Sequence, residues 1–144
     1  MLRGLIAIIA GLMLVDAATT YGGIGINLLF FAEDKGLTQQ ELLSYRVVGF
    51  YSIAMTVLLA LSAFLLLMEF KDWQFRFAKT MRLVVMSFLC LLVVTHILAT
   101  IDVVRISDSE FKGIFIVSTI YYALSTLGIV ILFGIVHWLK IKAK

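Results

Sequence analysis

Apolar residues gather in four long runs along this chain, and charged residues bound each run. The runs cover about residues 4–31, 47–68, 83–101 and 113–138, and only Asp16 places a charge inside the first of them. A bilayer core of about 30 Å needs about 20 apolar residues at 1.5 Å each. Transmembrane strands would alternate polar and apolar positions over about ten residues, and these runs do not. The pattern therefore predicts an all-α chain, an integral membrane bundle of four transmembrane helices.

Capping motifs place two helix starts ahead of their apolar runs. Thr38-Gln-Gln-Glu41 and Ser107-Asp-Ser-Glu110 both fit the capping box, in which the two end side chains satisfy backbone amides of the first turn. We expect one transmembrane domain over residues 1–144, with helices over about 4–31, 39–69, 82–104 and 108–140 and an interfacial segment over about 70–81.

The interfacial segment alternates aromatic and charged residues. Phe70, Trp73 and Phe77 are spaced three and four residues apart, which is typical of one face of a short helix at the membrane surface. We interpret the segment as an aromatic belt with basic anchors, and the alternative is a surface for lipid headgroups or a partner.

Lysine and arginine residues predict the orientation. Eight of them lie at the two termini and in the loop between the second and third helices, and four lie in the other two loops. The eight are Arg3, Lys71, Arg76, Lys79, Arg82, Lys140, Lys142 and Lys144. By the positive-inside rule, both termini should face the cytoplasm.

Composition excludes several classes of protein. The 144 residues are 62% hydrophobic and 15% charged, against roughly 45–50% apolar and about 25% charged in soluble domains. The mean hydropathy is +1.09. A soluble domain, a disordered chain and, with one cysteine, a disulfide-stapled module are excluded. The net charge of +3 follows from helix-end residues, so we expect the lipid bilayer as a partner and no nucleic acid.

Two ionisable residues, Asp16 and His96, lie deep inside predicted spans. They are eleven and thirteen residues from the predicted cytoplasmic ends of their helices, or roughly 17 and 20 Å. Thr56 and Ser125, on the returning helices, lie at about the same depth. All four helices thus bring a polar residue to one level near the middle of the membrane.

Neighbours at helical spacing extend this predicted polar layer. Thr19 and Thr20 follow Asp16, Thr100 follows His96, and Ser118, Tyr121, Tyr122 and Thr126 flank Ser125. The candidate intramembrane polar layer therefore consists of Asp16, Thr19, Thr20, Thr56, His96, Thr100 and Ser125. Its placement would permit a buried contact between Asp16 and His96.

Three interpretations of this layer remain open. It can hold the bundle in register, because hydrogen bonds and small residues drive helix association in lipid. Alternatively, Asp16 is a proton or cation site, since ionisable groups in membranes commonly mark transport pathways. The layer can also belong to a site that another chain completes.

Metal, cofactor and catalytic motifs are not evident in the sequence. His96 and His137 differ in depth by about 20 Å, which excludes one haem held by both within the chain. Cys90 lacks a second cysteine or a spaced histidine, so we interpret it as a packing residue. We expect no metal, no cofactor and no catalytic residue.

The segment Leu14-Val-Asp16-Ala-Ala-Thr19-Thr20-Tyr21-Gly22 resembles a family of small four-helix prokaryotic membrane proteins that is described only as a domain of unknown function. In that family an aspartate of the first helix is followed by threonine, glycine and an acidic loop, which Glu33 would match. The Asn-Pro that usually follows is replaced by Lys35 and Gly36, and the chain contains no proline. The resemblance implies a four-helix membrane fold and no activity.

The chain is also similar to small multidrug resistance transporters, which have four short helices and one acidic residue in the first. Asp16 and Thr20 stand four residues apart in the analogous place. The acidic residue of those transporters is a glutamate, and counterparts of their aromatic cage residues are missing here.

Taken together, the patterns favour an accessory or structural subunit of a larger membrane complex, or a self-associating bundle. One alternative is a dimeric proton- or cation-coupled transporter that uses Asp16. Another is a membrane cofactor-binding or enzymatic subunit that uses His96 and Asp16.

Overall fold

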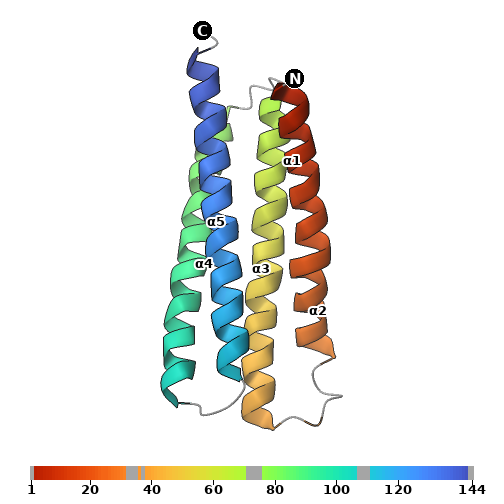
Figure 1. Ribbon diagram of the computed structural model, residues 1–144, viewed down its shortest axis with the longest axis vertical. Helices are drawn as coiled ribbons and strands as arrows, with labels where there is room; N and C mark the ends of the chain where they lie inside the picture. The colour runs from red at the N-terminus through yellow and green to blue at the C-terminus, as the bar shows by residue number, and fades with distance from the viewer. Residues whose placement is uncertain (1, 32–35, 37, 71–75, 107–110, 143–144) are drawn as a thin grey trace.

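The computed structural model describes the chain except for residues 1, 32–35, 37, 71–75, 107–110 and 143–144. The described residues form long helices that stand side by side as four rods (Figure 1). Each rod contains a helical stretch long and apolar enough to cross a membrane, over Gly4–Phe30, Gln39–Met68, Ala78–Arg105 and Lys112–Leu139. The predicted all-α chain with four membrane-spanning helices is confirmed at this level.

The first rod is continuous but changes its winding partway along. It consists of α1 (Leu2–Asp16), a π-helical segment η1 (Ala17–Gly22) and α2 (Gly23–Phe30). A π-helix bonds each amide to the carbonyl five residues back, and it commonly appears as a single wide turn inside an α-helix. The wide turn begins directly after Asp16, the only acidic residue of α1.

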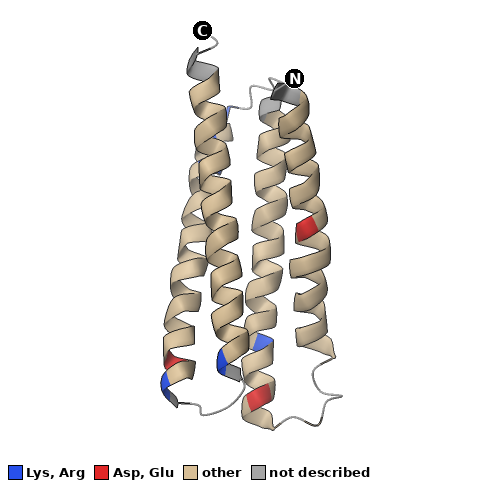
Figure 2. Cartoon of the chain, viewed as in Figure 1, with Lys and Arg blue, Asp and Glu red and all other residues tan. Residues whose placement is uncertain are grey.

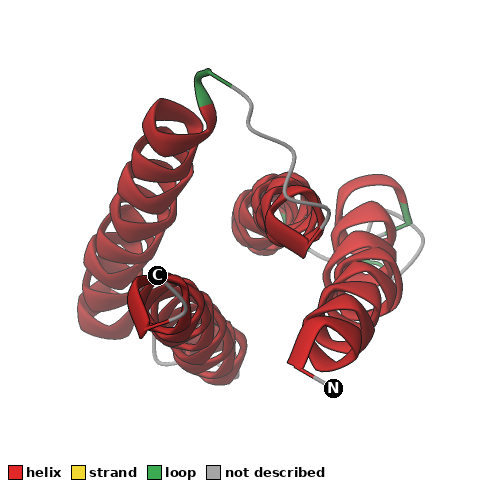
Figure 3. Ribbon diagram, turned by 90° about the horizontal axis from the view of Figure 1, so that it is seen from above, coloured by secondary structure: helices red, strands yellow, loops and turns green. Residues whose placement is uncertain are grey.

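The second rod, α3 (Gln39–Phe70), packs against every other rod. Seen along the bundle, α3 lies between the first rod on one side and the other two helices on the opposite side (Figure 3). Gly25 of α2 and Gly49 of α3 let the two backbones meet, since a Cβ at Gly49 would lie 3.1 Å from the Gly25 carbonyl oxygen. The contact fixes the first rod against α3.

The third and fourth rods, α4 (Ala78–Ile106) and α5 (Phe111–Lys142), form a neighbouring pair. Buried apolar side chains from all four rods fill the space between them, with Met55, Leu66, Leu89 and Tyr122 among the least exposed. Outward faces carry Leu, Ile, Val and Phe side chains, as expected where lipid surrounds the bundle.

Charged residues gather at both ends of the bundle, as the positions of the coloured segments show (Figure 2). Asp16 is the one acidic residue of α1, and it lies midway along the span Gly4–Phe30. Among the described residues, Asp16 is therefore the charged residue that lies in the apolar middle of the molecule. Such a position is costly in a membrane and needs an explanation.

The predicted cap of α3 is present. The amide of Thr38 donates to Oε2 of Glu41 (2.7 Å), and the amide of Glu41 donates to Oγ1 of Thr38 (3.4 Å). These two bonds are the reciprocal pair of a capping box. The second expected capping box, Ser107 to Glu110, lies outside the described residues.

The loop between α3 and α4 is shorter than expected. α3 continues to Phe70 and α4 begins at Ala78, four residues before the expected start at Arg82. Phe70 thus ends one spanning helix and Phe77 immediately precedes the next, while Trp73 lies outside the described residues. Both helices therefore extend past their apolar runs.

Candidate functional site

His96 is fully enclosed at the centre of the bundle. It projects from α4, and both of its ring nitrogens meet hydroxyl groups of α5. Nδ1 lies 2.8 Å from Oγ1 of Thr119, and Nε2 lies 3.3 Å from Oγ of Ser118. Thr100, one turn along α4, lies 2.8 Å from the Thr119 hydroxyl. The imidazole is therefore satisfied inside the chain, without a charged partner.

Aromatic rings enclose the same imidazole. The rings of Tyr51 and Tyr122 stand edge-on to it, each with its centroid 4.8 Å away, and Phe115 stacks on it at 5.7 Å. Perpendicular and offset arrangements of this kind are favoured by the ring quadrupoles. Hydrogen bonds from two helices and rings from α3 and α5 together fix the position of His96.

Two tyrosines carry the polar contacts from His96 toward the first rod. The hydroxyl of Tyr122 lies 2.6 Å from Oγ of Ser52, linking α5 to α3. In η1, the hydroxyl of Tyr21 lies 2.5 Å from Oγ of Ser125 and donates to the carbonyl of Tyr121 (3.2 Å). The ring centroids of Tyr21 and Tyr122 are 5.8 Å apart. All four rods thus contribute to one connected group of buried and half-buried polar residues.

We call this group the inner layer. It consists of Tyr21, Ser52, His96, Thr100, Ser118, Thr119, Tyr122 and Ser125. Thr56 borders it from α3, where its hydroxyl donates to the carbonyls of Ser52 (2.9 Å) and Ala17 (3.3 Å). The bond to Ala17 reaches the first residue of the π-helical segment, whose widened turn presents that carbonyl to α3.

Asp16 lies on the outer surface of the bundle. Its side chain is exposed, and its carboxylate accepts a hydrogen bond from the hydroxyl of Thr20, one turn further along, at 2.7 Å. Thr19 is exposed as well and donates to the carbonyl of Val15 (2.8 Å). Within the described part of the chain, Asp16 makes no hydrogen bond to the inner layer, although its partner Thr20 lines a cavity together with Tyr21 and Tyr122 of that layer.

The structure separates the predicted layer into two parts. His96, Thr100 and Ser125 belong to the inner layer and Thr56 borders it, whereas Asp16, Thr19 and Thr20 form a local group on the first rod. The sequence permitted a contact between Asp16 and His96, but the hydrogen bonds of the two residues go to other partners. Equal depth along the helices does not bring two side chains to the same side of the bundle.

Several residues of the inner layer were not part of the predicted set. The sequence places Tyr21 in the first apolar run, and the predicted layer does not include Ser52 or Thr119. Helical spacing held a signal for both hydroxyl residues, because Ser52 lies four residues before Thr56 and Thr119 lies three before Tyr122. Tyr21 offered no comparable signal, since its inward direction depends on the local winding of η1.

The chemistry available to the inner layer is hydrogen bonding among neutral groups. Over the described part of the chain, no three His, Cys, Asp or Glu residues lie close enough to bind a metal ion together. The inner layer contains no carboxylate beside the imidazole, which a general acid and base pair would need. Its hydroxyl groups and ring contacts instead join α3, α4, α5 and η1.

Comparison with known proteins gives no match, whether the chain is compared with protein-family models, with curated proteins or with solved structures.

Proposed function

We propose that this small multi-pass membrane protein is a structural subunit of a membrane assembly, and that it associates with other membrane-spanning helices through the outer surface of its first rod. The observation that carries this proposal is the exposed side chain of Asp16, placed midway along a span. The partner is a helix of a larger complex or of a second copy of the chain.

The cost of exposing Asp16 to lipid supports an external partner. Asp16 lies about 18 Å from Gly4 and about 21 Å from Phe30, the two ends of the span. An aspartate at the centre of a membrane helix costs about 2.5–3.5 kcal/mol on insertion scales. One hydroxyl from Thr20 offsets only part of this cost, whereas a donor from a neighbouring helix would remove the carboxylate from lipid.

Small and polar residues around Asp16 suit helix docking. Thr19, Gly23 and Asn27 are also exposed on the first rod and succeed one another every four residues. A Cβ built at Gly23 meets nothing within 4 Å, so packing inside the chain does not require glycine at this position. We call these four residues the Asp16 face. Glycine and hydrogen-bonding side chains are the residues that bring membrane helices together.

Exposure of the first rod points to the same surface. Only 17% of its apolar window is buried in the bundle, against 22% for α5, 28% for α4 and 39% for α3. The inner layer, by contrast, is complete within the chain, so it leaves little for a partner to add. Association through the first rod is therefore favoured over association through the inner layer.

We also infer that both ends of the chain face the cytoplasm. α1 begins and α5 ends at the same end of the bundle (Figure 1). In the sequence, eight of the twelve lysine and arginine residues fall near the two termini or between α3 and α4. Single cysteines placed at Lys79 and Lys112 of a Cys90→Ser chain test this inference. A membrane-impermeant thiol reagent added outside intact cells should label only the cysteine at Lys112.

Association is tested by purifying the chain from its native membrane in a mild detergent. Native mass spectrometry of the wild-type protein should show a complex heavier than one chain. Asp16→Leu should remove the partner and leave a folded single chain, because the change removes the buried donor–acceptor pair of the interface. Asp16→Asn, which keeps hydrogen bonding, should retain part of the complex.

The matched control is Asp102→Leu, which removes an exposed carboxylate near the end of α4. The complex should survive this change. A wild-type chain that runs as a monomer, or an Asp16→Leu chain that keeps its partner, would contradict the proposal. A complex that survives Asp16→Asn but loses proton or cation flux in liposomes would favour the transport alternative.

A further inference from the structure

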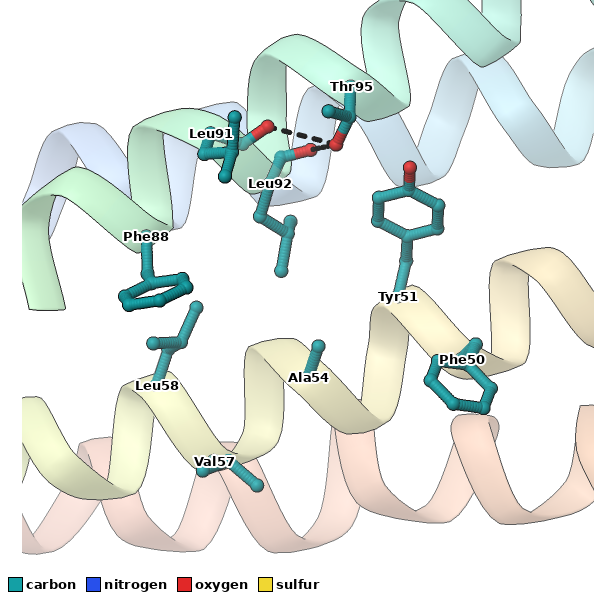
Figure 4. A pocket seen from close by; sticks show the side chains of 9 residues that line it. All are labelled: Phe50, Tyr51, Ala54, Val57, Leu58, Phe88, Leu91, Leu92 and Thr95. Atoms are coloured by element: carbon teal, nitrogen blue, oxygen red, sulfur yellow. Dashed lines mark hydrogen bonds between the residues drawn. The ribbon is translucent and has the colours of Figure 1, made fainter.

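A groove opens between α3 and α4 on the lipid-facing side of the bundle, apart from the Asp16 face. Its volume is about 460 Å³, and its walls are apolar and aromatic side chains. Figure 4 shows Tyr51 and Leu58 rising from α3 toward α4, and Phe88 and Leu92 reaching from α4 into the same space. Pockets for small molecules commonly have volumes of about 300–1,000 Å³ and this kind of lining.

One polar group in the groove lacks a partner within the described part of the chain. The hydroxyl of Tyr51 receives and donates no hydrogen bond there, although its ring packs edge-on against His96. The other hydroxyl of the groove, on Thr95, already donates to the carbonyls of Leu91 (2.9 Å) and Leu92 (3.1 Å) (Figure 4). A phenol without an acceptor is costly in hydrocarbon, and lipid tails offer no acceptor. The groove therefore suits a ligand that carries a hydrogen-bond acceptor for the Tyr51 hydroxyl.

Depth distinguishes between the lipids that could supply this acceptor. Tyr51 follows the exposed Arg46 by five residues, or about 7 Å, and Thr95 precedes the exposed Asp102 and Arg105 by about 10–15 Å. These charged residues mark the membrane surface, where phospholipid headgroups and their ester groups lie. The interfacial zone is about 5–7 Å thick, so at the level of Tyr51 and Thr95 a phospholipid presents mainly acyl chain, which cannot accept a hydrogen bond. A neutral lipid whose polar group enters the hydrocarbon can bring an acceptor to this level.

We propose that this groove binds a membrane-soluble carbonyl compound of the isoprenoid quinone class, with the hydroxyl of Tyr51 donating a hydrogen bond to one ring carbonyl. A flat quinone ring fits beside the aromatic faces of Phe88 and Tyr51. Its isoprenoid tail continues along the apolar wall formed by Ala54 and Leu58, toward the middle of the membrane. His96, behind Tyr51, holds the tyrosine ring in place.

The test uses the full chain in phosphatidylcholine nanodiscs and a photoreactive azido derivative of ubiquinone-2. Labelled peptides, identified by mass spectrometry, should fall within residues 50–58 and 88–95. An excess of unlabelled ubiquinone-2 should suppress this labelling. Tyr51→Phe removes the donor and keeps the ring, so labelling at these residues should fall about three- to tenfold, as expected for one hydrogen bond.

Two further variants make the test specific. Ala54→Leu adds bulk to the floor of the groove and should abolish labelling there. Tyr121→Phe removes a phenol hydroxyl from an exposed tyrosine of α5 and should leave labelling unchanged. Circular dichroism and the thermal transition verify that each variant is folded, and Tyr51→Phe decides the question if Ala54→Leu does not fold.

Four results would overturn the proposal. The first two are labelling that spreads equally over all four rods and labelling that persists in Tyr51→Phe. A photoreactive phosphatidylcholine that labels the same residues and resists ubiquinone-2 would show that the groove holds an acyl chain. Crosslinks between two copies through α3 and α4 would show that a second chain fills it.

Discussion

The inner layer and the Asp16 face lie at similar depth, yet they differ in burial and in the number of partners that the chain provides. His96 is 0% exposed and has hydrogen bonds to two hydroxyl groups of α5 and three rings around it. Asp16 is exposed and has one bond, to Thr20 on its own rod. The imidazole is enclosed by the bundle, and the carboxylate is exposed at its surface.

The difference separates folding from association. Polar groups that satisfy one another inside a chain join its helices and require no partner. A polar group on the outside of a span also needs a hydrogen-bond partner, but only another molecule can provide one. The inner layer should therefore set the stability of the single chain, and the Asp16 face should set its assembly.

The largest expected effect is the loss of His96. His96→Ala removes the central ring and opens a cavity among Tyr51, Phe115 and Tyr122, so the free energy of unfolding should fall by about 3–5 kcal/mol. Unfolding in detergent titrated with sodium dodecyl sulfate, followed by circular dichroism, measures this change. His137→Ala, at an exposed position near the end of α5, is the control and should have little effect. Equal losses in the two variants would show that the inner layer is not the stabilising centre.

The second effect concerns the contact that fixes the first rod. In Gly49→Ala the new Cβ would lie 2.9 Å from Cγ of Leu29 and 3.1 Å from the Gly25 carbonyl oxygen. Separation of the two backbones should cost about 1–3 kcal/mol in the same unfolding experiment. Gly128→Ala is the control, because its Cβ meets nothing within 4 Å and alanine favours helix by up to about 1 kcal/mol. A Gly49→Ala chain as stable as the control would mean that α2 and α3 are not in close contact.

A smaller effect is expected at the tyrosines of α5. Tyr122→Phe removes the bonds to Ser52 (2.6 Å) and to the carbonyl of Val48 (3.3 Å) and keeps the ring. The free energy of unfolding should fall by about 1–2 kcal/mol, since interhelical hydrogen bonds in membranes are modest. Tyr121→Phe, on the exposed side of the same helix, should change it by no more than a few tenths of a kcal/mol. If both variants lose the same stability, burial does not distinguish these hydroxyls.

The smallest effect has the opposite sign. The hydroxyl of Thr126 is buried and has no hydrogen-bond partner among the described residues. Thr126→Val keeps the shape and removes this oxygen, so the chain should be as stable as wild type or up to about 1 kcal/mol more stable. Thr100→Val removes a hydroxyl that bonds Thr119 and the His96 carbonyl, and it should destabilise the chain instead. Destabilisation by Thr126→Val would reveal a bond that this hydroxyl makes in solution.

Much of the fold could be predicted from sequence because spans and caps are local properties. Apolar length alone identified the four helices, and the spacing from Thr38 to Glu41 identified the start of α3. Depth along each helix followed from a constant rise per residue. The depth of Asp16 and His96 was therefore accessible without coordinates.

The side of the bundle that each residue faces was not accessible in the same way. In water, an apolar stripe marks the inner face of a helix, but a membrane helix is apolar all round. The rotation of α1 about its axis depends on the contact of Gly25 with Gly49, and the inward turn of Tyr21 depends on η1. Both depend on contacts between distant residues, so the exposure of Asp16 was not predicted.

The π-helical segment has a consequence for how this molecule can change over evolutionary time. Each residue of an α-helix advances the winding by about 100°, so removing one residue from Ala17–Gly22 would turn everything on one side of the deletion relative to the other. Tyr21 and the Asp16 carboxylate would then lose their present angular relation. Single-residue insertions and deletions in this six-residue window are thus a simple route by which a descendant chain could change the angle between its acid and Tyr21.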